Sequence, residues 1–298
     1  MMATVRSPES TVAASVKPGR YRVVTADAIE LALTRFVGKT TRPVPVVLTH
    51  GTFSNGRICS RLAEYLAENG FDCWVLDLRG HGESQRTVPN PSFEAFGLFD
   101  VPATLEFVKA HTGRPEVFLV GHSGGGLAFL MHLAHRSAAR SAVRGLVMLA
   151  SQATGACVSM RGRIIVIGAR LTTNLLGYTP GPAFRLGPEN EPKGVLEQWF
   201  QWNRTGQWTG RDGFDYLAAV RDLSVSALCL AGAGDRVIAP AEGCRRLFEA
   251  LGVRDKQWTL CGKSEGFSED FGHTRIVASR AAQREIWPRV MDWLASRS

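Results

Sequence analysis

Ser123 stands in a sequence pattern that suits a catalytic nucleophile. The segment 121–125 reads Gly-His-Ser-Gly-Gly, and the apolar run 117–120 comes directly before it. A G-x-S-x-G pattern between a strand and a helix predicts a sharp turn that lifts the serine hydroxyl above the edge of a sheet. Gly121 and Gly125 would relieve the crowding that such a turn creates. The alternative interpretation of this segment is a glycine-rich turn that only opens a helix.

A serine hydroxyl is a weak nucleophile near neutral pH, so it needs a base, and the base needs a carboxylate to orient it. His273 is our candidate for the base, because it lies in a predicted loop between the last strand and the last helix. Such a loop can lean over the sheet edge toward Ser123. The other histidines have simpler explanations. His122 adjoins the serine, but the turn is expected to direct its side chain elsewhere. His132 and His135 lie on the next helix facing solvent or neighbours, His111 closes another helix, and His50 and His81 are expected to bind backbone groups in turns.

Asp235 is our candidate for the orienting carboxylate. It follows the apolar run 225–230 by way of the glycine-containing segment 231–234. A carboxylate at the carboxyl end of a parallel strand reaches the same sheet edge as Ser123. Asp270 and Glu265 are the alternative acids, and Asp235 can also be an ordinary turn residue.

Two hydrogen-bond donors must stabilise the oxyanion that forms when a serine attacks a carbonyl group. We expect the backbone N–H of Gly124 to be one donor, because it follows the nucleophile. The second is expected from the loop after His50-Gly51, with Thr52 as the first choice and Phe53 as the second. The alternative is that this loop is only a turn that glycine permits.

Apolar runs that alternate with helical patterns must position these residues. Two β-rich runs within 21–37 predict an N-terminal hairpin. Later runs predict strands at 44–49, 71–78, 117–120, 143–150, 225–230 and 257–261. Helical spacing predicts helices at 57–69, 93–111, 127–136, 241–251 and 279–295, with a break or a new first turn at Pro102. The alternation predicts an α/β protein whose mostly parallel sheet is covered by helices on both faces.

Residues 152–211 interrupt this alternation. They are rich in proline and glycine, and an insertion of about sixty residues is far longer than an ordinary connection. We expect 152–211 to form a helical cap, 20–151 and 212–298 to form the α/β core, and 1–19 to be a flexible tail. The aromatic residues of the cap are expected mostly to form its own small core, with a few lining a pocket: Phe184, Trp199, Phe200, Trp202 and Trp208.

The composition fits a globular protein and excludes a wholly disordered or coiled-coil chain, since 45% of the 298 residues are hydrophobic and 21% are charged. Lys+Arg 35 against Asp+Glu 27 gives a net charge of +8, which raises the question of nucleic-acid binding. We expect no nucleic-acid partner, because there is no recognition motif or tight basic cluster. Arg136, Arg140 and Arg144 lie where a helix is expected to end.

Targeting and metal-binding signals are weak. No apolar stretch approaches the roughly 18 residues that predict a transmembrane segment, and residues 1–17 lack the apolar block of a signal peptide. We therefore expect a cytoplasmic protein. Six scattered cysteines without a C-x-x-C pair predict buried free thiols rather than a zinc site, and we expect neither a metal nor a cofactor. The sequence does not predict the oligomeric state.

The combination of these motifs resembles the α/β-hydrolase superfamily. The resemblance covers about 21–294 apart from the cap, and it rests on 50–52, 77–84 (Asp-Leu-Arg-Gly-His-Gly-Glu-Ser), 121–125, 234–235 and 272–273. The chain order Ser123, Asp235, His273 fits that of the superfamily. The resemblance implies an eight-stranded α/β-hydrolase sheet and the hydrolysis of an ester through an acyl-enzyme, without cofactor or metal.

Two segments resemble the acid-lipase branch, which includes gastric and lysosomal lipases: 50–55 (His-Gly-Thr-Phe-Ser-Asn) and 285–294 (Glu-Ile-Trp-Pro-Arg-Val-Met-Asp-Trp-Leu). Those relatives often carry an aspartate two residues after the histidine, where this chain has Arg275, and a glutamine after the serine, where it has Gly124. Related enzymes with Asp or Cys as nucleophile, such as epoxide hydrolases and dienelactone-hydrolase-like enzymes, are excluded by Ser123.

The resemblance thus leads us to expect a serine esterase or lipase-like enzyme that acts on a small-molecule ester, with the cap over an apolar acyl pocket. A peptidase or amidase and a thioesterase are alternatives on the same triad. A peptidase would use cap carboxylates to hold the substrate amine, and Glu189, Glu191 and Glu197 are available, although we expect them to be solvated surface charges. A non-catalytic hydrolase-fold receptor is a further alternative, which a complete triad disfavours.

Overall fold

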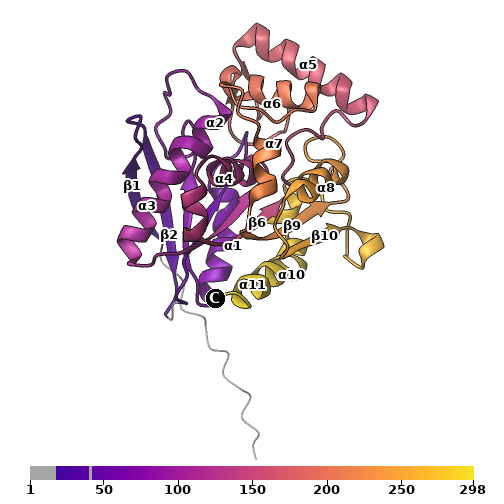
Figure 1. Cartoon of the computed structure of the whole chain (residues 1–298). Coiled ribbons are helices and arrows are strands. Elements are labelled where there is room, and N and C mark those ends of the chain that lie inside the picture. Colours follow the sequence, from indigo (N-terminus) through magenta and orange to yellow (C-terminus); the bar gives the residue numbers. More distant parts are fainter. Residues whose placement is uncertain (1–17, 40–41) are drawn as a thin grey trace, which may run out of the picture.

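A twisted eight-stranded β-sheet runs through the centre of the computed structural model, which describes residues 18–39 and 42–298 (Figure 1). The strand order is β1-β2-β4-β3-β5-β6-β9-β10. β2 pairs antiparallel with both β1 and β4, and the other pairs are parallel. The predicted mostly parallel sheet is therefore confirmed. Its strands are β1 (Gly19–Val24), β2 (Glu30–Val37), β3 (Val46–Thr49), β4 (Asp72–Asp77), β5 (Val117–His122), β6 (Val143–Leu149), β9 (Ser226–Gly232) and β10 (Lys256–Cys261).

The expected flexible tail, residues 1–19, falls almost entirely outside the described residues. Residues 1–17 are not described, and Gly19 already begins β1. β1 and β2 form the N-terminal hairpin that the two β-rich runs predicted.

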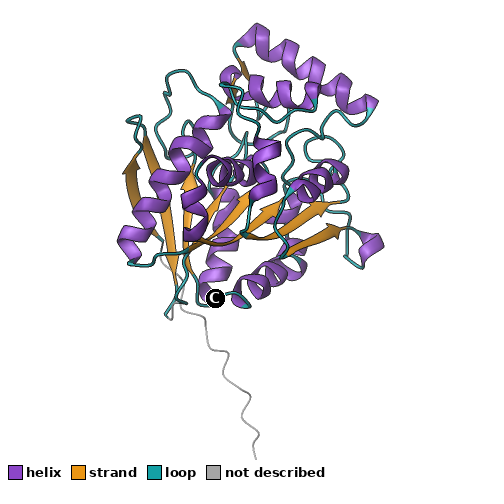
Figure 2. Cartoon of the chain, in the orientation of Figure 1, coloured by secondary structure: helices purple, strands orange, loops and turns teal. Residues whose placement is uncertain are grey.

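Helices cover both faces of the sheet (Figure 2). On one face α3 and α4 pack against the strands, and on the other face α1, α9, α10 and α11 do so. Residues of α8 contribute to both cores. The bounds of these helices are α1 (Arg57–Glu68), α3 (Val101–Thr112), α4 (Gly124–His135), α8 (Ala241–Ala250), α9 (Arg275–Ala278), α10 (Arg280–Glu285) and α11 (Trp287–Ala295).

Two of the predicted helices begin a new segment next to a proline. The range 93–111 consists of α2 (Phe93–Ala95), the π-helical turn η1 (Phe96–Asp100) and α3, whose first turn contains Pro102. The range 279–295 consists of α10 and α11, and Pro288 lies in the first turn of α11. Proline suits a first helical turn because its missing N–H has no intrahelical partner to bind there. The break at Pro102 was predicted, whereas the one at Pro288 was not.

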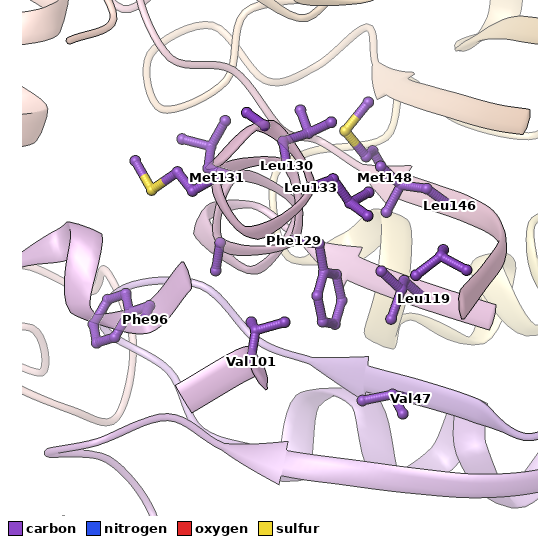
Figure 3. Packing of buried hydrophobic residues seen from close by; sticks show 14 of the residues in the cluster. Val47, Phe96, Val101, Leu119, Phe129, Leu130, Met131, Leu133, Leu146 and Met148 are labelled. Atoms are coloured by element: carbon purple, nitrogen blue, oxygen red, sulfur yellow. The ribbon is translucent and has the colours of Figure 1, made fainter. Parts of the chain in front are cut away.

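Helix α4 is buried on almost every side. All of its residues from Gly124 to Ala134 are buried. Figure 3 shows Phe129 between this helix and the strands that carry Leu119 and Val47. Because close packing leaves such a helix little freedom to move, its N-terminus keeps a constant position relative to the strand ends.

The segment 152–211 contains two helices and a short strand pair. These elements are α5 (Met160–Leu176), β7 (Tyr178–Thr179), β8 (Glu191–Pro192) and α6 (Lys193–Thr205). Figure 1 shows α5 and α6 beside each other at the top of the view, outside the main sheet. Seven large apolar residues of α5 are exposed, and they are Met160, Ile164, Ile165, Ile167, Leu171, Leu175 and Leu176.

The aromatic residues of segment 152–211 are divided between two cores. Phe200 belongs to a small apolar cluster between α5 and α6. Trp202 and Trp208 are completely buried in the main core instead, where the Trp202 ring meets Phe93 edge-on with 5.1 Å between centroids. We predicted that the aromatic residues of this segment mostly form a small core of their own. This is wrong for the two tryptophans, because α6 packs directly on α2. Phe184 is half exposed.

Within residues 18–39 and 42–298, no helix is both long and apolar enough to cross a membrane. The same residues hold no group of three or more His, Cys, Asp and Glu side chains that could bind a metal ion. The six cysteines are free thiols, and five of them are buried.

Candidate active site

Ser123 occupies a strained turn between β5 and α4. Its backbone angles are φ 54° and ψ −122°, a region that non-glycine residues rarely adopt and that is often found at functional sites. A Cβ atom at Gly121 would lie 2.4 Å from the backbone nitrogen of Gly126, and one at Gly125 would lie 2.6 Å from the carbonyl oxygen of His50. Positions 121 and 125, two residues before and two residues after the serine, must therefore be glycine for the turn to close.

The structure brings Ser123, His273 and Asp235 into one hydrogen-bonded chain. His273 Nε2 lies 2.9 Å from Ser123 Oγ, and His273 Nδ1 lies 2.6 Å from Asp235 Oδ2. Because an ionised carboxylate only accepts hydrogen bonds, Nδ1 carries the ring proton and its N–H donates a hydrogen bond to Asp235. Nε2 is then free to accept the hydroxyl proton of Ser123. This is the arrangement that a serine needs to become a nucleophile.

Asp235 is held as an ionised, buried acceptor. Asp235 lies in the turn that follows β9, and its side chain is 3% exposed. The backbone N–H groups of Ile238 and Ala239 donate to its two oxygens at 3.2 and 3.1 Å. Burial would raise the pKa of Asp235, but the hydrogen bond and charge of His273 and these backbone donors outweigh it and lower the pKa. Asp235 can therefore stabilise an imidazolium at His273.

His122 supports His273 in a way that the sequence did not indicate. Its Nε2 lies 2.9 Å from the carbonyl oxygen of His273, and the two rings lie 4.9 Å apart. The sequence led us to expect only that the turn directs His122 away from Ser123, and it did not predict this contact with His273. Burial lowers the pKa of His122 to about 3, so the ring stays neutral and donates from Nε2. Only its position next to Ser123 in the sequence could have suggested this role.

The loop after β3 lies against the turn that carries Ser123. A Cβ atom at Gly51 would come within 2.6 Å of Ser123 Cβ and within 2.7 Å of the Gly124 nitrogen, so only glycine permits this approach. Thr52 and Gly124 border the same cavity as Ser123. The N–H of Phe53, the second choice for the oxyanion donor, donates instead to Glu191 Oε2 at 2.8 Å. Thr52 therefore remains the better candidate.

A mostly apolar cavity of about 90 Å³ opens beside Ser123. Its walls come from the core and from segment 152–211 together, with Leu127 from α4, Val166 from α5, and Leu196 and Trp199 from α6. The turn after β9 contributes Ile238. Such a cavity suits an apolar group attached to the carbon that the serine attacks.

Two of the three acidic residues considered as substrate anchors are buried and already bound. Glu189 accepts from Arg86 at 2.7 Å and from Asn55 at 2.7 Å. Glu191 is 0% exposed. The expectation of solvated surface charges is wrong for both, because segment 152–211 folds back onto the loops of the core. The third, Glu197, is partly exposed and pairs with Arg170 at 2.9 Å.

Three of the other histidines, His50, His132 and His135, make contacts away from the hydrogen-bonded chain at Ser123. His50 accepts from the N–H of Leu78 at 3.1 Å, and burial lowers its pKa to about 3. His132 is buried on α4, whereas His135 is exposed and stacks on Phe214 with 4.4 Å between ring centroids. None of these three rings belongs to the hydrogen-bonded chain at Ser123.

The alternative acids lie in the loop that carries His273 but hold other groups. Asp270 Oδ1 accepts from the N–H of Lys263 at 2.8 Å, and Glu265 is exposed in a 3₁₀ turn. Asp235 is therefore the carboxylate that the structure places on His273, as the sequence suggested.

Comparison with known proteins shows which proteins the chain resembles. Residues 44–163 match the family model of the alpha/beta hydrolase fold. A tear acid lipase-like protein from Mesocricetus auratus is 34% identical over 131 residues, which cover 37% of this chain and 33% of that protein. The chain thus spans about a third of the length of the curated relatives it matches.

Solved esterase and lipase structures share the fold over nearly the whole chain. A thermophilic esterase from Thermogutta terrifontis superposes with a TM-score of 0.63 at 20% identity, covering 94% of this chain and 100% of that one. A monoacylglycerol lipase from Paleococcus ferrophilus gives a TM-score of 0.64 at 21% identity, covering 90% and 99%. The chain therefore has the α/β-hydrolase fold, as its motifs predicted. In sequence and in fold it resembles lipases and esterases.

Proposed function

We propose that this protein is a serine hydrolase that cleaves carboxylic esters with a small apolar acyl group. The observation that carries the proposal is the hydrogen-bonded chain of Ser123, His273 and Asp235 at the mouth of an apolar cavity. The likeness to lipases and esterases supports the same reaction class.

The reaction begins when His273 Nε2 takes the hydroxyl proton of Ser123 while Oγ attacks the ester carbonyl. The carbonyl oxygen becomes an oxyanion, to which the N–H groups of Gly124 and Thr52 donate. Collapse of this intermediate expels the alcohol, which receives the proton from His273 Nε2. A water molecule, deprotonated by His273, then attacks the acyl-serine, and the acid is released as His273 Nε2 returns the proton to Ser123 Oγ. Asp235 stabilises the imidazolium during both steps.

The size of the cavity favours short acyl chains. Its volume of about 90 Å³ is smaller than the roughly 150 Å³ of an engineered apolar cavity that holds one benzene molecule. Leu127 and Trp199 are among the residues that line the cavity beside Ser123, and a space of this size does not hold an extended fatty-acid chain. We therefore propose that the acyl group is about four to six carbon atoms long.

Amide and thioester substrates differ in what they need from the site. An aminopeptidase needs a carboxylate to hold the substrate amine, and Glu189 and Glu191 are both bound to groups of the core. The geometry therefore favours esters over aminoacyl amides. A thioester has the same acyl group and a better leaving group, so we propose thioesters as secondary substrates on the same triad.

The test is hydrolysis of nitrophenyl esters of increasing acyl length by the wild type and by Ser123→Ala. We expect the wild type to prefer the butyrate to the dodecanoate by about tenfold or more in kcat/KM. Ser123→Ala should lose about 10⁴-fold or more in kcat. Ser137→Ala, at an exposed serine far from the cavity, is the matched control and should retain full activity.

A fluorophosphonate probe distinguishes an enzyme from a non-catalytic receptor of the same fold. We expect the probe to label wild type at Ser123 and to leave Ser123→Ala unlabelled. Equal hydrolysis by wild type and Ser123→Ala would contradict the proposed mechanism, and a wild type that neither hydrolyses esters nor reacts with the probe would favour the receptor.

Three further expectations remain predictions. They are the division into a core of 20–151 and 212–298 with a cap of 152–211, a cytoplasmic location, and the lack of a nucleic-acid partner.

A further inference from the structure

One segment of the cap holds the backbone of Phe53 from both sides. The N–H of Glu189 donates to the carbonyl oxygen of Phe53 at 3.1 Å, and the carboxylate of Glu191 accepts from the Phe53 N–H at 2.8 Å. A Cβ atom at Gly187 would lie 2.0 Å from the same carbonyl oxygen, so this segment passes very close to the loop. Phe53 itself has φ 61°, which costs energy for a residue with a side chain. Segment 187–191 therefore keeps the loop in a conformation that it would not adopt alone.

Glu191 is the charged member of this contact, and His81 neutralises it. His81 Nδ1 lies 2.9 Å from the carbonyl oxygen of Arg79, and Nε2 lies 3.0 Å from Glu191 Oε2. Both partners only accept hydrogen bonds, so both ring nitrogens carry protons and the ring is an imidazolium. Burial opposes this charge, but the charge and hydrogen bond of Glu191 outweigh it and raise the pKa of His81. The two side chains are 1% and 0% exposed.

The opposite charges of Glu191 and His81 cancel, and this matters because the pair lies beside the loop that carries Thr52. Phe53 follows Thr52, whose N–H is the second oxyanion donor in the proposed mechanism. An uncompensated carboxylate this close to a developing oxyanion would oppose it in a low-dielectric site. The His81 imidazolium removes that penalty, and Glu191 can then act through its hydrogen bond alone. The peptide group between Thr52 and Phe53 is thus held without an adverse charge.

We propose that Glu191 is a positioning residue for the oxyanion hole. By binding the Phe53 N–H, it orients the peptide that follows Thr52 and so keeps the Thr52 N–H directed at the oxyanion. The cap thereby contributes to catalysis as well as to the acyl pocket. This role rests on the proposed function, since it requires an oxyanion to be stabilised at Ser123.

Two conservative substitutions separate the reach of Glu191 from its charge. Glu191→Gln keeps an oxygen within reach of the Phe53 N–H but removes the charge. Its NH₂ group can take the place of Oε1, because Oε1 has no partner among residues 18–39 and 42–298. Glu191→Asp keeps the charge but withdraws the carboxylate by about 1.5 Å. We expect Glu191→Asp to lower kcat by about tenfold or more, because a displaced oxyanion donor is costly. Glu191→Gln should stay within about threefold of the wild type.

Several readouts distinguish positioning from a purely structural role. KM for the short-chain ester should change by less than about twofold in both variants, because the acyl pocket does not contain Glu191. Binding of an alkyl boronic acid, which forms a tetrahedral adduct on a serine, should weaken in parallel with kcat in Glu191→Asp. Rates are expressed per serine that a fluorophosphonate finally labels, so that loss of folded protein does not mimic loss of catalysis. Glu197→Gln removes an equal charge from the cap away from the loop and should behave as wild type.

The opposite pattern would overturn the positioning role. If kcat followed the charge, with Glu191→Gln impaired and Glu191→Asp intact, the hydrogen bond to Phe53 would not be what matters. Unchanged kcat and boronate affinity in both variants would also overturn it. A wild type without esterase activity or probe labelling would instead overturn the proposed function, and this role with it.

Discussion

Asp235 and His273 are 38 residues apart in the chain and 2.6 Å apart in space. The short contact assigns the histidine tautomer, because the carboxylate accepts from Nδ1 and leaves Nε2 as an acceptor for Ser123. In Asp235→Asn the amide group can donate to Nδ1, which places the ring proton on Nε2. We expect kcat for ester hydrolysis to fall by about 10⁴-fold, with KM nearly unchanged, as steady-state kinetics will measure.

The alternative acid provides the control for that substitution. Asp270 lies in the His273 loop but binds the N–H of Lys263, so Asp270→Asn should retain kcat within about threefold of wild type. If Asp270→Asn were the more damaging of the two, the proposed role of Asp235 would be wrong.

At this scale the sequence named the residues of the proposed triad but missed those that contact them. Ser123, Asp235 and His273 carry local signals: a glycine-flanked serine after an apolar run, an acid shortly after a strand, and a histidine in the loop between the last strand and the last helix. His122 and Glu191 carry none, because their roles depend on contacts with residues 151 and 138 positions away. Glu191 in particular looked like one more charge in a polar segment until the fold placed it against Phe53.

At the scale of elements, the contact between β3 and the start of α4 depends on glycine. A Cβ atom at Gly125 would lie 2.6 Å from the His50 carbonyl oxygen and 2.8 Å from that of Thr49. Because backbone atoms cannot give way as a flexible side chain can, Gly125→Ala should lower the free energy of unfolding by about 2–3 kcal/mol. It should also lower kcat, since the same shift moves Ser123 away from Thr52. Urea denaturation and ester kinetics together measure both effects.

Gly168 is the matched control for a glycine-to-alanine change in a helix. It lies in α5, and nothing comes within 4 Å of a Cβ atom built there. Gly168→Ala should therefore raise the free energy of unfolding by about 0.5–1 kcal/mol, because alanine loses less backbone freedom on folding. Equal effects of the two substitutions would contradict the steric role assigned to Gly125.

At the scale of the whole molecule, buried neutral histidines make stability depend on pH. Burial is the largest cause that lowers the pKa of His132 from 6.5 to about 4, and the charges of Arg136 and Lys109 lower it further. Burial also lowers the pKa of His50 and His122 to about 3. Between pH 6.5 and these pKa values, the three histidines are protonated in the unfolded chain but neutral in the folded protein. Their contribution to stability is present above pH 6.5 and is lost as the pH falls toward 4.

His132→Met removes one of these groups without touching the proposed site. We expect the free energy of unfolding of the wild type to fall between pH 7 and pH 4, and the fall to be about 3 kcal/mol smaller in His132→Met. Chemical denaturation across this range measures the difference. His81 has the opposite sign: its raised pKa contributes stability below pH 6.5, which is lost as the pH rises through the folded-state pKa. If the free energy of unfolding had the same pH dependence in His132→Met as in the wild type, His132 would not be held neutral in the folded protein.

The sequence by itself determined the class of the fold and which residues are the candidates for chemistry at its centre. Apolar runs alternating with helical patterns define a mostly parallel sheet, and the loops that follow its parallel strands lie along one edge, so Ser123, Asp235 and His273 could be placed together. These are consequences of local periodicity and of strand direction, which neighbouring residues encode. The tertiary structure alone decided how segment 152–211 is used. Trp202 and Trp208 joined the main core, and Glu191 was buried against Phe53 and His81. Such contacts join residues more than a hundred positions apart, and they depend on how two folded surfaces fit together, which no local pattern records.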